Sequence, residues 1–271
     1  NGFFNNYDGL ASGLQPIGVK YDDASRNVVC TLEQDDIMDG LNWLHKLYQD
    51  GIINPDANVV TDGGKGSIFG SAQGWPAAAT TWAFNSGIEK YDLTQVFGPL
   101  YTTETIQGSM NAISANSKYK TEALKVLQLM NTDSKFRDMC AYGTEGNYME
   151  YAEDGTVQKL RDDWNWPSYT QGTFFILSTQ ADGDPDAWNQ VKEQNESATA
   201  STCLGFALDV TNIQNEIANC NTVWDKYKND LLTGASDPAT AVPACIEELK
   251  AAGLDTVIEE AQKQVDEFFA N

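Results

Sequence analysis

Residues 211–234 read TNIQNEIANCNTVWDKYKNDLLTG, and this stretch decides the fold of the second half of the chain. Its apolar residues recur every three or four positions, as they do on the buried face of an amphipathic helix: Ile213, Ile217, Cys220, Trp224, Tyr227 and Leu231. Gly234 comes next, and glycine adopts the left-handed backbone that ends many helices. The stretch therefore predicts a helix that ends at Gly234.

Two more helices are expected after it. Asp237-Pro238 is a helix N-cap followed by proline at the first helical position, and Gly253 marks the end of that helix. The last helix presents one apolar face, formed by Val257, Ala261, Val265 and Phe268. Residues 211–271 are thus predicted to be almost entirely helical.

Towards the N-terminus, short strands alternate with helices. Residues 1–30 are rich in Gly, Asn and Tyr and indicate loops and short strands. Thr31 and Gln34 have the spacing of a capping box, which predicts a helix that ends at Gly51. Ser117 is expected to cap a second helix, whose Tyr119, Ala123, Val126, Leu127 and Met130 share a face. Further short strands are expected at 67–69, 109–114, 174–177 and around 204–206. The pattern predicts an α/β fold with a helical C-terminal part.

The overall charge narrows the range of partners. The 271 residues include 39 Asp and Glu but only 17 Lys and Arg, a formal net charge of −22. Such a chain is repelled by nucleic-acid phosphates and by anionic lipid surfaces. No run approaches the ~20 apolar residues that a membrane-spanning helix needs. The sequence begins at Asn1 without a signal peptide, which leaves open that a leader was removed or that the chain was shortened.

Few residues favour metal or nucleophilic chemistry. The five cysteines, Cys30, Cys140, Cys203, Cys220 and Cys245, form no CxxC pair, so a structural zinc is not expected and we interpret them as buried free thiols. A disulfide stays open, because spacing does not show proximity. The single histidine, His45, lies beside an apolar helix face and is expected to be packed or solvated rather than catalytic. No metal and no cofactor are predicted.

Residues of the types that three other chemistries need are present, but their spacing favours none of them. Paired carboxylates would suit a glycoside hydrolase, but pairs such as Glu247-Glu248 and Glu259-Glu260 have the spacing of solvated helix surfaces. The run 182–186 is rich in Asp, but it does not have the spacing of an EF-hand loop and is more typical of a polar turn before a helix. Residues 63–67 lack the spacing of a phosphate-binding loop.

The aromatic residues outside the helices are more informative. Trp75, Trp82, Trp164, Trp166 and Tyr169 lie in stretches rich in Gly and Pro rather than at helical spacing. Core packing is one interpretation of such residues. The other is a stacking platform, in which an indole covers the apolar face of a sugar while nearby Asn, Asp and Gln bind its hydroxyls.

Several short motifs, in order along the chain, resemble extracellular solute-binding proteins of carbohydrate ABC transporters (family 1, maltose-binding-like). Gly51-Ile52-Ile53-Asn54-Pro55-Asp56 matches the family's helix exit, and Gly74-Trp75-Pro76 matches its Trp loop. Ala112-Ile113-Ser114-Ala115-Asn116-Ser117-Lys118 matches a strand that leads into a helix. The remainder, including Tyr142-Gly143-Thr144-Glu145-Gly146, is similar to the LipO-like lipoprotein subgroup with a DUF3502-type C-terminal domain.

The resemblance implies a type II periplasmic-binding-protein fold with two lobes, of which this chain holds the C-terminal half. Residues 1–98 would form an α/β segment of the second lobe, 99–145 a strand and helix that return to the first lobe, and 146–271 the mostly helical domain. The first-lobe sheet, the signal peptide and the lipidated cysteine have no counterpart here. Asn147-Tyr148 stands where the subgroup has Lys-His-Tyr, so one polar side chain near the cleft differs.

The implied function is capture of a sugar or oligosaccharide by lobe closure and its delivery to ABC permease subunits in the membrane. The protein would be a monomeric, non-enzymatic component on the bacterial cell surface, anchored in its full-length form through an N-terminal lipid. A glycan-active enzyme with paired carboxylates is the alternative, and a domain with only an interaction role is a third.

Seven residues are candidates for ligand binding. Trp75 is the first, because it occupies the Trp loop and has neighbours that bind hydroxyls without bringing charge: Ser71, Gln73 and Thr80. Packing between a strand and a helix is the other interpretation of Trp75. Trp166 and Tyr169 flank the stiff Pro167, and Glu145 and Asp209 are possible hydroxyl acceptors. The full set is Trp75, Gln73, Trp82, Glu145, Trp166, Tyr169 and Asp209.

Overall fold

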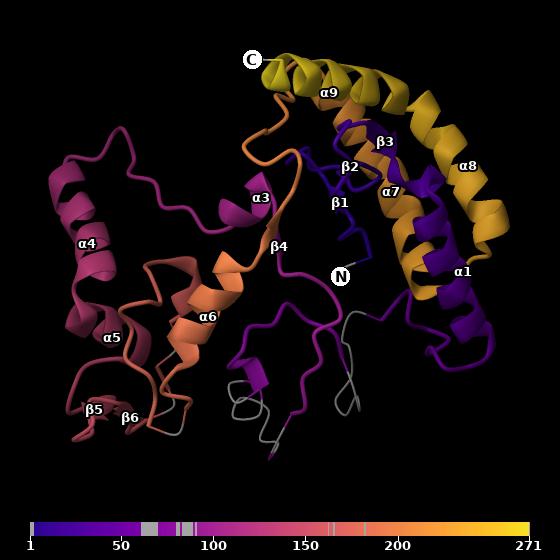
Figure 1. The fold of residues 1–271 in the computed structure, drawn as a ribbon. Helices are drawn as coiled ribbons and strands as arrows, with labels where there is room; N and C mark the ends of the chain where they lie inside the picture. The colour runs from indigo at the N-terminus through magenta and orange to yellow at the C-terminus, as the bar shows by residue number, and fades with distance from the viewer. Residues whose placement is uncertain are drawn as a thin grey trace. The chain divides into compact units, whose positions relative to one another are not determined.

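The computed structural model describes residues 3–60, 70–79, 82, 89, 91–161, 163–164, 166–181 and 183–270 (Figure 1). The chain forms two compact units that interleave along the sequence. Unit 1 comprises Asn1–Ala72, Tyr101–Thr105 and Ala200–Asn271, and unit 2 comprises Gln73–Leu100 and Ile106–Thr199. This grouping differs from the ranges 1–98, 99–145 and 146–271, which refer to the lobes of a larger protein, and that assignment stays a prediction.

Unit 1 begins with a small sheet and one helix. The strands β1 (Tyr7–Asp8), β2 (Ile17–Lys20) and β3 (Val28–Cys30) pair antiparallel in the order 1-2-3. A 3₁₀ turn, η1 (Thr31–Glu33), leads into α1 (Asp35–Gln49). The loops and short strands expected over residues 1–30 are confirmed.

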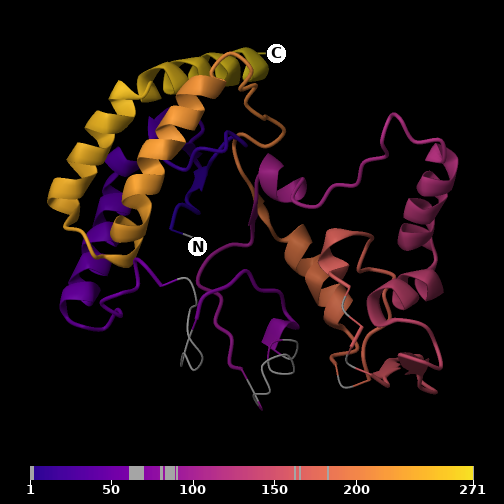
Figure 2. The ribbon, with the colours of Figure 1, turned by 180° about the vertical axis from the view of Figure 1, so that it is seen from behind.

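Three helices complete unit 1: α7 (Gln214–Thr233), α8 (Pro238–Ala251) and α9 (Leu254–Phe269). They pack against one another, α7 and α8 also contact α1, and α9 contacts β3 (Figures 1 and 2). The core between them includes the fully buried side chains of Trp224, Leu231 and Leu249. The expectation that residues 211–271 are almost entirely helical is therefore confirmed.

The last helix also forms hydrogen bonds with the first sheet and the loop before β3. The backbone N–H of Val28 donates to Oε1 of Gln262 at 2.8 Å, and Nε2 of Gln262 donates to the carbonyl of Arg26 at 3.2 Å. On α8, Lys250 forms an ion pair of 3.0 Å with Glu33. The N-terminal strands thus depend on the C-terminal helices for both packing and hydrogen bonds.

The predicted helix ends are confirmed in the C-terminal part and corrected near Thr31. Asp237 accepts from the N–H of Ala239 as the N-cap of α8, and Gly234 has the left-handed backbone, with φ of 77°. The capping box at Thr31 is wrong, because Thr31 lies in the 3₁₀ turn and its hydroxyl donates to the carbonyl of Gln15. Gln34 instead takes the N-cap position of α1, and its side chain donates to the carbonyl of Cys30.

Unit 2 is built mainly from short elements and loops. At the points where the chain passes between the units, β4 (Leu100–Tyr101) and β7 (Thr199–Ala200) pair, and the short α3 (Thr103–Ile106) follows β4. The remaining elements are α4 (Lys120–Thr132), α5 (Ser134–Tyr142), β5 (Met149–Tyr151), β6 (Val157–Lys159), η2 (Ser168–Thr170) and α6 (Ala187–Glu196). A small core forms around Tyr142, Met149, Val157 and Leu177.

Three of the expected strands are wrong. Residues 109–114 form no strand, and residues 174–177 form a turn in which the N–H of Leu177 donates to the carbonyl of Phe174 at 3.0 Å. Residues 204–206 also lie in turn and loop structure. The expected strand at 67–69 lies outside the described residues. Ser117 does not cap α4, which begins at Lys120. Within the described part of the chain, every helix is too short or too polar to cross a lipid bilayer.

Candidate functional site

The Trp loop places two of the predicted aromatic residues in contact. The rings of Trp75 and Trp82 meet edge to face, with centroids 5.8 Å apart and an interplanar angle of 80°. Both side chains are partly buried, whereas Ser71 and Gln73 are exposed. The carbonyl of Trp75 accepts from the N–H of Ala78 at 2.9 Å, which fixes the turn that follows it. Thr80 lies outside the described residues.

A second pair of predicted aromatic residues lies in the loop around η2. Trp166 is 36% exposed and Tyr169 is 72% exposed, so the tyrosine ring is largely open to solvent. The loop is closed by local bonds, from the N–H of Ser168 to the carbonyl of Trp166 and from the N–H of Thr170 to the carbonyl of Pro167. The hydroxyl of Ser109 also donates to the carbonyl of Tyr169. Exposed rings on a constrained loop suit contact with the flat face of a sugar.

Glu145 lies in a tight turn whose shape depends on two glycines. Gly143 has φ of 91°, and a Cβ at that position would lie 2.5 Å from Cβ of Tyr148. Gly146 has φ of 77°, and its N–H donates to the carbonyl of Met149. The exposed Glu145 and the partly buried Tyr148 are therefore presented by the same turn.

This turn meets Trp164, which the sequence placed among the loop aromatic residues, and Arg161, which it did not indicate. The rings of Tyr148 and Trp164 are 5.2 Å apart, and the guanidinium of Arg161 lies over the Tyr148 ring, 4.8 Å from its centroid. Nη1 of Arg161 donates to Oδ1 of Asn147 at 3.4 Å. Trp164 is anchored by its indole N–H, which donates to the carbonyl of Cys140 at 3.0 Å.

Arg161 also pairs with Asp163, since its Nε donates to Oδ1 at 2.9 Å and its Nη2 to Oδ2. These bonds hold the pKa of Asp163 below its usual value. A ring, a planar cation, an amide and a carboxylate together offer a stacking surface for the apolar face of a sugar and hydrogen-bond donors and acceptors for its hydroxyls. Of this group the sequence indicated the aromatic Trp164 and, through the resemblance, Asn147-Tyr148 near the cleft. Arg161 and Asp163 were not indicated, because alternating charge at 161 and 163 resembles an ordinary solvated loop.

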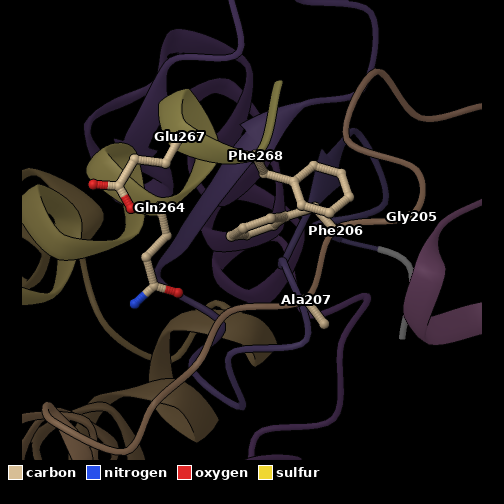
Figure 3. A pocket seen from close by; sticks show the side chains of 6 residues that line it. All are labelled: Gly205, Phe206, Ala207, Gln264, Glu267 and Phe268. Carbon is tan, nitrogen blue, oxygen red and sulfur yellow. The ribbon is translucent and has the colours of Figure 1, made fainter. Parts of the chain in front are cut away.

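Asp209 is separate from these groups and lies in unit 1. Its Oδ1 accepts from the N–H and the hydroxyl of Thr211, which lowers the pKa of the carboxyl, and its backbone exchanges two hydrogen bonds with the side chain of Gln264. Gln264 lines an open hollow on unit 1 together with Gly205, Phe206, Ala207, Glu267 and Phe268 (Figure 3). Oδ1 of Asp209 is therefore occupied by its own turn.

The predicted residues thus fall into local groups. Trp75 contacts Trp82, with Gln73 beside them in sequence; Trp166 and Tyr169 share a loop; and Glu145 lies in the turn that carries Tyr148. These six belong to unit 2 and Asp209 belongs to unit 1.

The cysteines and the histidine take part in the packing of the fold. Cys30, Cys203, Cys220 and Cys245 are buried and Cys140 is partly buried, and all five are free, as expected. Nδ1 of His45 lies 2.7 Å from the carbonyl of Gly234, which confirms its packed environment. Within the described ranges, no three side chains of His, Cys, Asp or Glu gather as a metal site requires. Asp184 and Asp186, from the Asp-rich run, accept bonds from Gln190 and Asn189 of α6.

The chain was compared with protein families, with curated proteins and with solved structures. Residues 202–270 match the family described as "Domain of unknown function (DUF3502)". Over 98% of its length the chain is 26% identical to a carbohydrate ABC transporter substrate-binding protein of Streptococcus pneumoniae serotype 4 (strain ATCC BAA-334 / TIGR4). The chain spans 57% of that relative's length.

The solved structures agree. The N-glycan transport solute binding protein (NgtS) from Streptococcus pneumoniae is 26% identical and superposes on 98% of this chain. The TM-score is 0.83 for that protein alone, 0.80 for its complex with Man1GlcNAc and 0.76 for its complex with Man5GlcNAc. The matches cover 61–62% of the NgtS chain. In sequence and in fold, the chain is therefore similar to the C-terminal part of the solute-binding proteins of carbohydrate ABC transporters, as its motifs indicated.

Proposed function

We propose that this chain is the C-terminal part of the component of an ABC importer that captures an oligosaccharide. The observation that carries the proposal is the likeness to NgtS over 98% of the chain, in both sequence and fold. NgtS is described with Man1GlcNAc and Man5GlcNAc, so the proposed ligand class is an oligosaccharide that contains mannose and N-acetylglucosamine. Two observations on unit 2 support this class: the exposed rings of Trp166 and Tyr169, and the Tyr148 ring under Arg161, which bonds to an amide and a carboxylate.

The proposed ligand contacts are those of the local groups described above. Trp75, Trp82, Trp166 and Tyr169 would stack on sugar rings, and Gln73, Glu145 and Asp209 would bind hydroxyls. Stacking favours flat apolar ring faces, whereas hydrogen bonds fix orientation, so a combination of both suits a saccharide.

In the proposed mechanism, ligand contacts shift an equilibrium between open and closed arrangements of two lobes, and no bond is cleaved. The closed form would dock on permease subunits in the membrane. The full-length protein would lie on the outer face of the cell, held by an N-terminal lipid.

Calorimetry on the full-length protein tests the proposal. Man1GlcNAc and Man5GlcNAc should bind, and maltotriose serves as a comparison sugar of different composition. Trp43→Ala is the matched control for variants of the proposed contacts such as Trp75→Ala. Trp43 is 62% exposed on α1 of unit 1 and belongs to none of those contacts. The proposal would be contradicted if the protein bound neither glycan and no member of a wider panel of oligosaccharides.

The non-enzymatic part of the proposal has its own test. After prolonged incubation with the protein, each glycan should elute unchanged in chromatography. Cleavage that disappears when one Asp or Glu is replaced would instead support the alternative of a glycan-active enzyme.

A further inference from the structure

Two adjacent charged residues on α5 are buried. Arg137 is 0% exposed and Asp138 is 1% exposed. Burial of a charge is costly unless hydrogen bonds replace the lost water. The partners of these two side chains therefore matter more than those of any exposed charged pair in the same unit.

Arg137 bonds to backbone rather than to a carboxylate. Its Nε donates to the carbonyl of Thr173 at 3.0 Å, and its Nη2 donates to the carbonyl of Ser168 at 2.8 Å. The guanidinium thus spans both ends of the segment 168–173. Gly172 lies directly against it, since a Cβ there would be 3.0 Å from Nε of Arg137 and 2.8 Å from the carbonyl of Met130.

Asp138 fixes the chain a few residues further on. Its Oδ1 accepts from the N–H of Ser178 at 2.9 Å, and its Oδ2 accepts from the hydroxyls of Ser178 and Tyr151 at 2.8 and 2.9 Å. The segment 166–178 is therefore tied to α5 at three backbone positions, Ser168, Thr173 and Ser178.

The segment has little regular structure of its own. Apart from the 3₁₀ turn η2, it forms only turns, bends and irregular backbone. It also carries Trp166 and Tyr169, whose rings are exposed. A loop that had to become ordered on each binding event would lose affinity through conformational entropy, whereas a loop held in advance does not.

We propose that Arg137 is a positioning residue: its guanidinium, bonded to Ser168 and Thr173, holds the 166–173 loop so that Trp166 and Tyr169 present their rings to an oligosaccharide. The inference rests on the proposed function, and it adds a buried residue that does not touch the ligand. Loss of the guanidinium would release the loop and weaken binding through the two aromatic residues alone.

The test is a double-mutant cycle on the full-length protein with Man5GlcNAc as the probe. Arg137→Met should weaken binding about tenfold, the scale expected when two aromatic side chains must be ordered on binding. In a Trp166→Ala/Tyr169→Ala background, which must retain measurable affinity through the remaining contacts, the same substitution should change affinity little, because the side chains it positions are gone. Affinity is measured well below the melting transition of every variant.

Two further measurements separate positioning from general support of the fold. Hydrogen exchange should become faster in the 166–178 segment of Arg137→Met while the β5–β6 hairpin keeps its protection. Gly172→Ala perturbs the same contact without removing the charge, and it should reproduce the affinity loss if Arg137→Met does not fold.

The outcomes are distinct. An equal loss of affinity in both backgrounds, or an unchanged affinity for Arg137→Met and Gly172→Ala in a wild-type protein that binds the glycan, would overturn the positioning role and leave the proposed function standing. Failure of the wild-type protein to bind any oligosaccharide would overturn the proposed function and this inference together.

Discussion

Trp75 is partly buried and meets Trp82 edge to face, with ring centroids 5.8 Å apart. We expect Trp75→Ala in the full-length protein to weaken binding of Man5GlcNAc by roughly 1–3 kcal/mol, a tenfold to hundredfold loss, if sugar stacking has the strength of other aromatic contacts. Calorimetry measures this, with Trp43→Ala as the control. A variant that unfolds, or that binds as wild type does, would show that the indole serves only to pack the loop.

The buried thiols make stability depend on pH in the alkaline range. Burial raises the pKa of Cys30, Cys203 and Cys220 to about 11 and that of Cys245 to about 12. In the unfolded chain these thiols ionise near ~8.5. Between the two values the unfolded state binds fewer protons than the folded state, so the free energy of unfolding should fall as pH rises.

Urea denaturation at a series of pH values from roughly 8 to 11 tests this expectation, since the window lies between the unfolded and folded thiol pKa values. Cys245→Ala removes one of the titrating groups, and its free energy of unfolding should decline less steeply than that of the wild-type protein. An equally steep decline would assign the alkaline effect to other groups, such as the buried tyrosines.

At this scale, residues with a purely local role were predictable from the sequence. Asp237 caps the helix it precedes, and Gly234 ends the helix before it. The predicted capping role of Thr31 is wrong because Thr31 lies in the 3₁₀ turn that precedes α1. Its hydroxyl donates to the carbonyl of Gln15, in a different segment. Arg161 was missed for the same kind of reason: its position over Tyr148 depends on a contact between two loops.

Among the secondary-structure elements, the turn from α7 to α8 has little tolerance for a side chain. Gly234 has φ of 77°, and a Cβ there would overlap the backbone carbonyl of Leu44 in α1. Gly51, in the same unit, has φ of 73° and no atom within 4 Å of its Cβ position. Gly51→Ala should therefore cost only the backbone penalty of about 1–2 kcal/mol, and Gly234→Ala distinctly more. Urea denaturation compares the two variants, and equal losses would contradict the steric argument.

The helix α4 has an unusual number of exposed apolar side chains. Leu124 is 59% exposed, Val126 is 47% exposed and Leu129 is 39% exposed. The relative that this chain matches is longer, and residues 99–145 were predicted to belong to its first lobe. Val126 and Leu129 lie about 60° apart around the helix and share one exposed face. We propose that this face of α4 packs against that lobe, since burial of such side chains is favourable.

Cysteine labelling checks the proposal for α4. A maleimide should modify Val126→Cys more slowly in the full-length protein than in the 271-residue chain. Gln128→Cys, at an exposed position about 160° around the helix from Val126, should react at similar rates in both. Equal rates for Val126→Cys would show that the face stays open to solvent in the longer protein.

The helices were more predictable than the strands for a physical reason. In α7, α8 and α9 one face is buried throughout, so the apolar period of the sequence follows the structure. The hydrophobic run 174–177 resembles a strand in composition, but Phe174 stacks on Trp188, with ring centroids 4.8 Å apart, and both rings pack against the small core that contains Leu177. Short apolar runs do not specify a strand without a partner to pair with.

For the molecule as a whole, repulsion between like charges opposes the folded state. The formal net charge is −22, and the ion pairs of the described residues lie on the surface, where such pairs contribute little. Raising NaCl from about 20 mM to about 500 mM shortens the screening length and should raise the melting temperature. Equimolar KCl should act alike, whereas a fall in melting temperature with both salts would contradict the argument.

The division of the chain could be predicted only in part. Periodicity located the C-terminal helices, but it did not show that they would also pack on α1 and β3, which come much earlier in the chain. That pairing arises from contacts such as the one between Val28 and Gln262, which are 234 positions apart. Local sequence patterns do not indicate which distant residue a side chain will contact.

The dependence of the first sheet on α9 also sets the order in which the protein can mature. A ribosome makes β1, β2 and β3 well before it makes Gln262, so the apolar side of these strands lacks the cover of α9 until the last helix has been made. Unit 1 can reach its final state only once the last helix has emerged. A chain interrupted before α9 would thus leave both the first sheet and the remaining helices of unit 1 without cover on the surfaces that α9 packs against.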